Sequence, residues 1–317
     1  MIRKSGMAAA IAALVGLAGL AGQAAASTAS LQKVSGKPTL VLVAKKREEN
    51  VVYVTYQAGK KTLELRDKGS LPGYSDIRMT FDSAKSLPGC EFKRELDFFG
   101  QPMMERVICE VSKVKQVFVM LGDKDDVFFA GDQTYDSTKP RIPLFARGGK
   151  GNDQLIGGLG NDFLFGEAGR DIVEGSKGND KISGGTGNDS LSGDEIYTSD
   201  APPRKGGNDL IIGGAGKDYI YPGSGRDRVG AGAGNDLVSS VSDRDRDLVD
   251  CGAGRQDSLL GIDHRGYRFA EKGISGCETI GSGLFGNWTW SCSKKRGCLA
   301  NATPFAAKEE EAGSAQF

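Results

Sequence analysis

The chain has few of the residues on which common metal and catalytic sites depend. Among 317 residues there are one histidine, His264, and two tryptophans. One histidine cannot build the His-Glu-x-x-His site of zinc proteases, and no Cys-x-x-Cys pair suggests structural zinc. No serine has glycine both two residues before and two residues after it, so the nucleophile motif of α/β-hydrolases is also missing. We place His264 on the surface, because its neighbours are polar.

Long apolar runs are missing too, except for Met7–Leu20, which is too short to span a bilayer. Arg3 and Lys4 precede this run and three alanines, residues 24–26, follow it. This order predicts a signal peptide over residues 1–26, with a membrane anchor as the alternative. We therefore expect a secreted, extracellular protein without a transmembrane segment in its mature chain, or one in the periplasm or at the cell surface. A pore-forming toxin would need an apolar membrane segment that this chain does not have.

Charge of either sign is not in excess, since 41 basic residues balance 41 acidic ones. Neither a nucleic acid nor an anionic membrane is therefore expected as a partner. An even number of cysteines in an exported protein suggests disulfides. Pairing between neighbours is the simplest of fifteen connectivities, and it predicts Cys90–Cys109, Cys251–Cys277 and Cys292–Cys298.

Glycine is abundant, with 47 residues, about twice its usual share. A nine-residue repeat begins at Gly148 and explains many of these glycines. Its units are GGKGNDQLI, GGLGNDFLF, GEAGRDIVE, GSKGNDKIS and GGTGNDSLS, followed after an interruption by GGNDLII, GGAGKDYIY, PGSGRDRVG and AGAGNDLVS. The fourth position is always glycine, the sixth always aspartate and the eighth always aliphatic. No strand-helix-strand unit surrounds the glycines, which excludes a dinucleotide-binding reading.

These units resemble the repeats-in-toxin (RTX) family, the haemolysin-type calcium-binding repeats of consensus G-G-x-G-x-D-x-U-x, in which U is aliphatic. The resemblance implies an all-β fold, a parallel β-roll (β-solenoid) over residues 121–250 that binds several Ca²⁺ ions. It implies that the repeat aspartates bind calcium: Asp153, Asp162, Asp171, Asp180, Asp189, Asp209, Asp218, Asp227 and Asp236. It also implies turn carbonyl ligands near Gly148, Gly151, Gly157, Gly160, Gly166, Gly169, Gly175, Gly178, Gly184, Gly187, Gly213 and Gly216.

In the family, successive turns lie on alternating edges of the spiral. One edge would then stack Asp153, Asp171 and Asp189, and the other Asp162 and Asp180. After the interruption, Asp209 would pair with Asp227, and Asp218 with Asp236. The edge that each later pair joins depends on the path of residues 193–205, which stays open at this point.

The residues themselves indicate why metal would matter. The last three residues of a unit form a short strand with one buried aliphatic side chain, worth roughly 1.5–3 kcal/mol. Ordering a glycine-rich turn opposes this at about 1–2 kcal/mol per residue, so burial alone falls short. Calcium prefers carboxylate and carbonyl oxygens, which these turns offer. Stacked aspartates repel one another without metal, so we expect binding and folding to be coupled.

The flanks of the array are less regular. We expect a strand-rich region over residues 27–120, degenerate repeats with a disulfide cap over 251–299, and a flexible tail over 300–317. Asp126 lies three periods before Asp153, where a turn role and a ligand role are equally plausible, and the same holds for Asp247. Gln256 stands where a repeat would have aspartate. The interruption, residues 193–205, is expected to be a solvated loop that includes Asp194, Glu195 and Asp200.

Two functions from different classes fit this sequence. The first is a non-catalytic calcium-binding exoprotein, with cell-surface glycans or proteins as candidate partners. The alternative is a secreted hydrolase or polysaccharide-active enzyme that carries the repeats as a folding module. The missing motifs oppose the hydrolase. A carboxylate-based enzyme needs no local motif, and a cleft with a perturbed carboxylate outside the repeat turns would favour it.

Overall fold

The computed structural model describes residues 28–44, 49–67, 80–81, 89–96, 102–131, 140–194, 206–241, 247–262, 274–277, 279–282, 289–293 and 297–301. The expected signal peptide, Glu195, Asp200, His264 and residues 302–317 of the expected tail lie outside these segments. Within them the secondary structure is strands and two short 3-10 turns, η1 (Ala58–Lys60) and η2 (Val111–Lys113). The fold is therefore all-β, as expected.

The strands form two long sheets. The first has eleven strands in the spatial order β22-β20-β18-β16-β14-β12-β10-β8-β2-β1-β5. Its strands are β1 (Thr28–Val34), β2 (Lys37–Val43), β5 (Thr80–Phe81), β8 (Gln116–Gly122), β10 (Leu144–Lys150), β12 (Phe163–Ala168), β14 (Lys181–Thr186), β16 (Leu210–Ala215), β18 (Arg228–Ala233), β20 (Leu248–Asp250) and β22 (Ile274–Ser275).

The second sheet has fourteen strands in the order β25-β24-β23-β21-β19-β17-β15-β13-β11-β9-β3-β4-β7-β6. Its strands are β3 (Val51–Gln57), β4 (Thr62–Asp67), β6 (Cys90–Leu96), β7 (Pro102–Glu110), β9 (Val127–Ala130), β11 (Gln154–Ile156), β13 (Ile172–Glu174), β15 (Ser190–Ser192), β17 (Tyr219–Tyr221), β19 (Leu237–Val241), β21 (Ser258–Ile262), β23 (Thr279–Ser282), β24 (Thr289–Ser293) and β25 (Gly297–Asn301).

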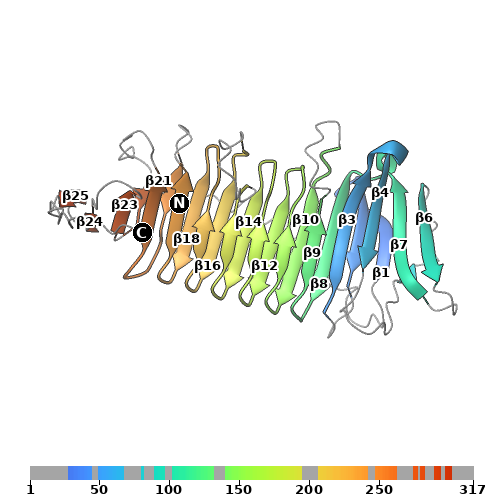
Figure 1. Ribbon diagram of the computed structural model, residues 1–317, viewed down its shortest axis with the longest axis horizontal. Coiled ribbons are helices and arrows are strands. Elements are labelled where there is room, and N and C mark those ends of the chain that lie inside the picture. Colours follow the sequence, from blue (N-terminus) through green and yellow to red (C-terminus); the bar gives the residue numbers. More distant parts are fainter. Residues whose placement is uncertain are drawn as a thin grey trace, which may run out of the picture.

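From β8 to β23 the chain alternates between the two sheets, so one strand from each, with two turns, makes a coil. Within this stretch each strand pairs in parallel with the strand one coil later, as β12 does with β14 and β11 with β13. Stacked coils give the elongated roll in Figure 1. The parallel β-roll that the resemblance to the RTX repeats implies is confirmed.

The eighth position of each repeat lies between the sheets. In the first sheet Leu164 is in register with Ile182, and in the second Leu155 is in register with Val173. All nine side chains at this position are at most 1% exposed: Leu155, Leu164, Val173, Ile182, Leu191, Ile211, Ile220, Val229 and Val238. Side chains alternate between faces along a strand, so a three-residue strand contributes one side chain to this narrow core.

The region before the repeats continues the same two sheets. β2 pairs in parallel with β8, and β3 with β9, so these four strands extend the roll. Larger side chains fill the core here, among them Leu40, Leu42, Leu65 and Phe128, each fully buried. Beyond them, β1, β4, β7 and β6 pair antiparallel and close this end of the roll (Figure 1).

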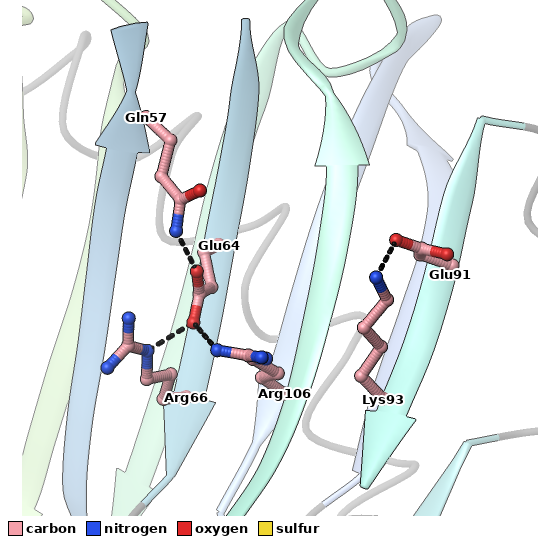
Figure 2. A network of polar contacts seen from close by, with 6 residues as sticks. All are labelled: Gln57, Glu64, Arg66, Glu91, Lys93 and Arg106. Carbon is pink, nitrogen blue, oxygen red and sulfur yellow. Dashed lines mark hydrogen bonds and ion pairs between the residues drawn. The ribbon is translucent and has the colours of Figure 1, made fainter. Parts of the chain in front are cut away.

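A buried carboxylate holds the antiparallel strands together. Glu64 on β4 is fully buried, and it accepts hydrogen bonds from Gln57 Nε2 on β3 and from Arg66 Nε. Arg106 on β7 adds an ion pair at 3.3 Å (Figure 2). A buried charge is tolerated when it is paired and hydrogen-bonded, and this arrangement joins three neighbouring strands.

One disulfide bond lies at each end of the roll. Cys90 on β6 is bonded to Cys109 on β7, and Cys251 is bonded to Cys277. These are two of the three pairs suggested by the spacing. Cys292 and Cys298 stand opposite each other in the antiparallel pair β24–β25, while their side chains lie outside the description. No helix among the residues that the structure describes is long and apolar enough to cross a membrane.

Candidate metal centre

Each repeat aspartate directly precedes a strand, and its side chain points into the turn. All nine are at most 2% exposed. Asp153, Asp171, Asp189, Asp218 and Asp236 precede strands of the second sheet, and we call this row of turns the first edge. Those on the other row, the second edge, precede strands of the first sheet: Asp162, Asp180, Asp209 and Asp227.

One oxygen of each carboxylate builds a hydrogen-bonded ladder along the first edge. Oδ1 accepts the backbone N–H of the aspartate one coil earlier, over 2.8–2.9 Å. The donor–acceptor pairs are Asp126–Asp153, Asp153–Asp171, Asp171–Asp189, Asp189–Asp218, Asp218–Asp236 and Asp236–Asp257. Backbone groups of adjacent coils are thus tied together by the side chain that the repeat conserves at position six.

The second edge has an equivalent ladder, with donor–acceptor pairs Leu144–Asp162, Asp162–Asp180, Asp180–Asp209, Asp209–Asp227 and Asp227–Asp247. This ladder decides the question that the sequence left open. The interrupted coil returns to the second edge at Asp209, so Asp209 and Asp227 continue the row of Asp162 and Asp180. Asp218 and Asp236 continue the first edge.

The other carboxylate oxygen is different. Oδ2 is buried and has no hydrogen-bond donor in eight of the nine aspartates: Asp153, Asp171, Asp180, Asp189, Asp209, Asp218, Asp227 and Asp236. Asp162 is the exception, since its Oδ2 accepts the N–H of Gly158 at 2.7 Å. A buried anionic oxygen without a donor is costly, and a cation would satisfy it.

At the first glycine of four units, Gly175, Gly184, Gly193 and Gly213, a carbonyl oxygen of the next coil meets the unsatisfied carboxylate oxygen. A Cβ built on Gly175 would lie 2.5 Å from Asp180 Oδ2 and 2.5 Å from the carbonyl oxygen of Gly193, one coil later. A Cβ on Gly213 would lie 2.5 Å from Asp218 Oδ2 and close to the carbonyl oxygen of Ala231. Glycine is required here by this close approach, and the result is a pair of converging oxygens. Mixed carboxylate and carbonyl oxygens suit calcium.

Units that have another residue in place of glycine at position one still supply a main-chain carbonyl oxygen there. Pro222 presents its carbonyl oxygen to Gly193, as Ala231 does to Gly213. No three His, Cys, Asp or Glu side chains converge on one point in the part of the chain that the structure describes. The main-chain carbonyl oxygens of these turns, such as those of Pro222 and Ala231, are further oxygen ligands of the kind that calcium accepts.

Burial raises the pKa of all nine repeat aspartates, because desolvation disfavours the charged form. The pKa reaches about 7 for Asp153, Asp162 and Asp209, about 8 for Asp227 and about 10 for Asp180. The pKa of Asp180 is raised furthest, since neighbouring carboxylates repel its charge after desolvation. The turns are thus built to hold either protons or a cation.

Position five forms a third ladder on the outside of the turns. Asn152 Oδ1 accepts the N–H of Arg170 at 2.9 Å, and Asn179 Oδ1 accepts the N–H of Asn208 at 2.7 Å. These asparagines link the backbones of successive coils, a role for which the sequence signal is their recurrence directly before the aspartate.

In the irregular units, the structure places three acidic residues differently from what the sequence suggests. Asp126 is 27 residues before Asp153, yet it lies on the same edge one coil earlier. Strict nine-residue counting would place it on the other edge, so nine residues are inserted between them. In the last unit Asp257, and not Gln256, accepts the ladder hydrogen bond from the N–H of Asp236, because this turn has one extra residue. Asp194, expected in a solvated loop, is 7% exposed.

The fold and these turns define a parallel β-roll in which metal-binding turns alternate along two edges. The family model of the RTX calcium-binding nonapeptide repeat matches residues 145–173, 165–195 and 205–238. These segments are therefore RTX calcium-binding repeats, as the resemblance implied, and calcium is the ligand that they indicate. No curated protein and no solved structure shows significant similarity to the chain.

Proposed function

We propose that the chain is an exported, non-catalytic calcium-binding protein whose repeat coils fold when calcium binds. The buried Oδ2 atoms carry this proposal. Eight of them have no hydrogen-bond donor. In Asp180, Asp189, Asp209 and Asp218 the atom converges with a carbonyl oxygen of the next coil on the first glycine of the unit. Calcium would satisfy both sets of oxygens and would remove the repulsion between stacked carboxylates, so metal and coil stabilise each other.

The export part of the proposal is supported by the N-terminal apolar run and by the two disulfides, which persist in oxidising compartments. The non-catalytic part is supported by the missing hydrolase motifs. It is also supported by Glu64, a buried carboxylate outside the repeats whose charge is already neutralised by Arg66 and Arg106. A paired acid and base for glycoside chemistry would need carboxylates that are not held in this way.

Far-UV circular dichroism with EDTA and with millimolar calcium tests the coupling. We expect the strand signal of the repeats to be weak in EDTA and to increase on adding calcium, with a steep concentration dependence because each turn serves two neighbours. Magnesium at the same concentration should give little change, since it requires strict octahedral geometry. A spectrum that is the same in EDTA and in calcium would contradict calcium-coupled folding.

A further inference from the structure

A buried carboxylate outside the repeat consensus lies at the second edge. Asp194 stands at position two of the interrupted coil, which resumes after residue 205. Neighbouring turns of this edge have Gly158, Ser176 and Gly223 at the same position. Asp194 is 7% exposed, and an aspartate is seldom this well buried in a protein without a specific purpose.

The Asp194 carboxylate bridges two successive turns. Oδ1 accepts the N–H of Gly207, in its own coil, at 3.2 Å, and Oδ2 accepts the N–H of Ser224, in the next coil, at 2.7 Å. It therefore lies in the gap between the coil of Asp209 and the coil of Asp227.

The same gap contains oxygens of the kind that bind calcium. Asp209 is 2% exposed, and its Oδ2 has no hydrogen-bond donor. A Cβ built on Gly193, next to Asp194, would overlap both this atom and the carbonyl oxygen of Pro222. A Cβ built on Gly206 would overlap both Asp194 Oδ2 and the carbonyl oxygen of Ser224. An unsatisfied buried oxygen among carbonyl oxygens and a second carboxylate points to a bound cation.

Asp194 also concentrates negative charge here. Its charge is felt by Asp180, Asp209 and Asp227, whose pKa values it helps to raise after desolvation. Repulsion within this group disappears when a divalent ion binds. In a consensus turn position two is glycine. The gap between the coils of Asp209 and Asp227 therefore contains one more negative charge than the gap between two consensus turns.

We propose that Asp194 is an affinity-determining residue of the calcium site between the coils of Asp209 and Asp227, and that it makes this site the tightest of the roll. The inference rests on the proposed calcium-binding function. Asp194 acts through its charge, which stabilises the ion, and through its bridge to Ser224, which keeps the two turns at the spacing that the ion needs. The interrupted coil then binds calcium at concentrations at which other turns are still empty.

Calcium titration of the full chain by calorimetry tests this, with Asp194→Asn and with Asp194→Gly, which restores the consensus residue. Glu167→Gln is the matched control: Glu167 also occupies position two, but on the first edge, paired with Arg147 and with its side chain 34% exposed. We expect the tightest class of sites to weaken roughly 10- to 100-fold in both Asp194 variants, as for other residues that support a metal site. Glu167→Gln should titrate like the wild type.

A second readout separates charge from hydrogen bonding. Terbium luminescence should show that Asp194→Asn lowers the preference for the trivalent ion over calcium, whereas Asp194→Glu should retain it. A wild-type titration for Asp194→Asn would overturn the inference, as would an equal weakening of every site, since a purely structural bridge would act on the roll as a whole. If the wild type itself binds no calcium, the proposed function fails instead.

Discussion

At the scale of single residues, each repeat aspartate uses its two oxygens differently. Oδ1 accepts a backbone N–H from the neighbouring coil, as Asp171 does from Asp153 at 2.8 Å. Oδ2 has no donor in eight of the nine, and in four of these it converges with a carbonyl oxygen of the next coil. Asparagine could keep the first role but would lose the negative charge of the second. This explains why position six is aspartate in all nine units, although asparagine is frequent at position five.

The raised pKa values predict how pH acts on the metal-free coils. Burial raises the pKa of Asp227 from its ordinary value of 3.8 to about 8 in the folded coil. Between these values the folded form binds more protons than the unfolded form, so the stability of the metal-free coil decreases as pH rises from about 4 to about 8. This loss of stability is one reason why we expect the coils to be unfolded near neutral pH until calcium binds.

Calorimetric titrations in two buffers of different ionisation enthalpy measure how many protons calcium displaces. We expect few at about pH 7, because coils that are unfolded without metal have already ionised their aspartates, and more at about pH 4, near the ordinary pKa of aspartate. Large proton release at about pH 7 would show that the metal-free coils are folded with protonated carboxylates, which contradicts calcium-coupled folding.

Position two contains a strained serine that can be tested. Ser176 has φ of 72°, a left-handed conformation that disfavours residues with a Cβ by about 1–2 kcal/mol. It retains a hydrogen bond to Glu174 at 3.1 Å, which offsets part of this strain. We expect Ser176→Gly to raise the free energy of unfolding in saturating calcium by about 0.5–1 kcal/mol, measured with denaturant.

The reverse change, Gly185→Ser, is the matched control. Gly185 has φ of 121°, and a Cβ there would overlap the carbonyl oxygen of Glu167. This variant should be clearly destabilised. Equal effects of the two substitutions would mean that backbone strain at position two contributes nothing.

At the scale of elements, the turns tolerate insertions that the strands do not. Successive ladder aspartates are 18 residues apart in the regular coils but 29 apart between Asp180 and Asp209. Pairing of β14 with β16 and of β15 with β17 nevertheless stays in register. The 11 additional residues correspond to 195–205 of the sequence. Loop insertions of this kind are tolerated because closing a longer loop adds little entropy.

Deletion of residues 195–205 should therefore leave the roll intact. It joins Asp194 to Gly206 and restores the regular length of the unit. We expect the calcium titration and the circular dichroism in calcium to match those of the wild type. As a control, deletion of Gly187 and Asn188 shifts Asp189 out of the ladder and should abolish part of the binding. Loss of binding in the first variant would show that the insertion itself contributes to the metal sites.

At the scale of the whole molecule, the two halves of the roll are stabilised differently. The N-terminal coils bury large side chains such as Leu40, Leu65 and Phe128, and a disulfide joins β6 to β7. The repeat coils bury one aliphatic side chain per strand and depend on their turns. Asn50 connects the halves, because its N–H and Nδ2 both donate to Asp126 Oδ1, at 2.6 and 2.9 Å.

Chelation should consequently unfold one half and spare the other. In EDTA, hydrogen exchange followed by mass spectrometry should show protection over residues 28–131 and fast exchange over residues 145–241. Hydrophobic burial near 25 cal/mol per Å² stabilises the first segment without metal. Simultaneous loss of protection in both segments would show that the roll is one cooperative unit.

Much of this protein follows from sequence periodicity alone. A nine-residue period with one aliphatic residue and one aspartate per unit predicts stacked coils, because each unit must repeat the same local geometry. It also predicts the row of buried aliphatic side chains at position eight and identifies the nine aspartates. The resemblance to the RTX repeats adds that the edges alternate, and the nine-residue count then assigns each aspartate to an edge as long as it is uninterrupted. It fails at Asp126 and at Asp257, where insertions of nine residues and of one residue change the count.

The tertiary structure fixes the edge to which a strand returns after an insertion, which counting residues along the sequence cannot give. Strand pairing across the gap returned Asp209 to the second edge, and contacts between residues 30 positions apart buried Asp194 against Ser224. β2 and β3 belong to the roll because they pair with β8 and β9. The sequence does not indicate this pairing, because that region contains no repeat. The sequence determines each unit through local geometry, whereas register after an insertion depends on hydrogen bonds between distant segments.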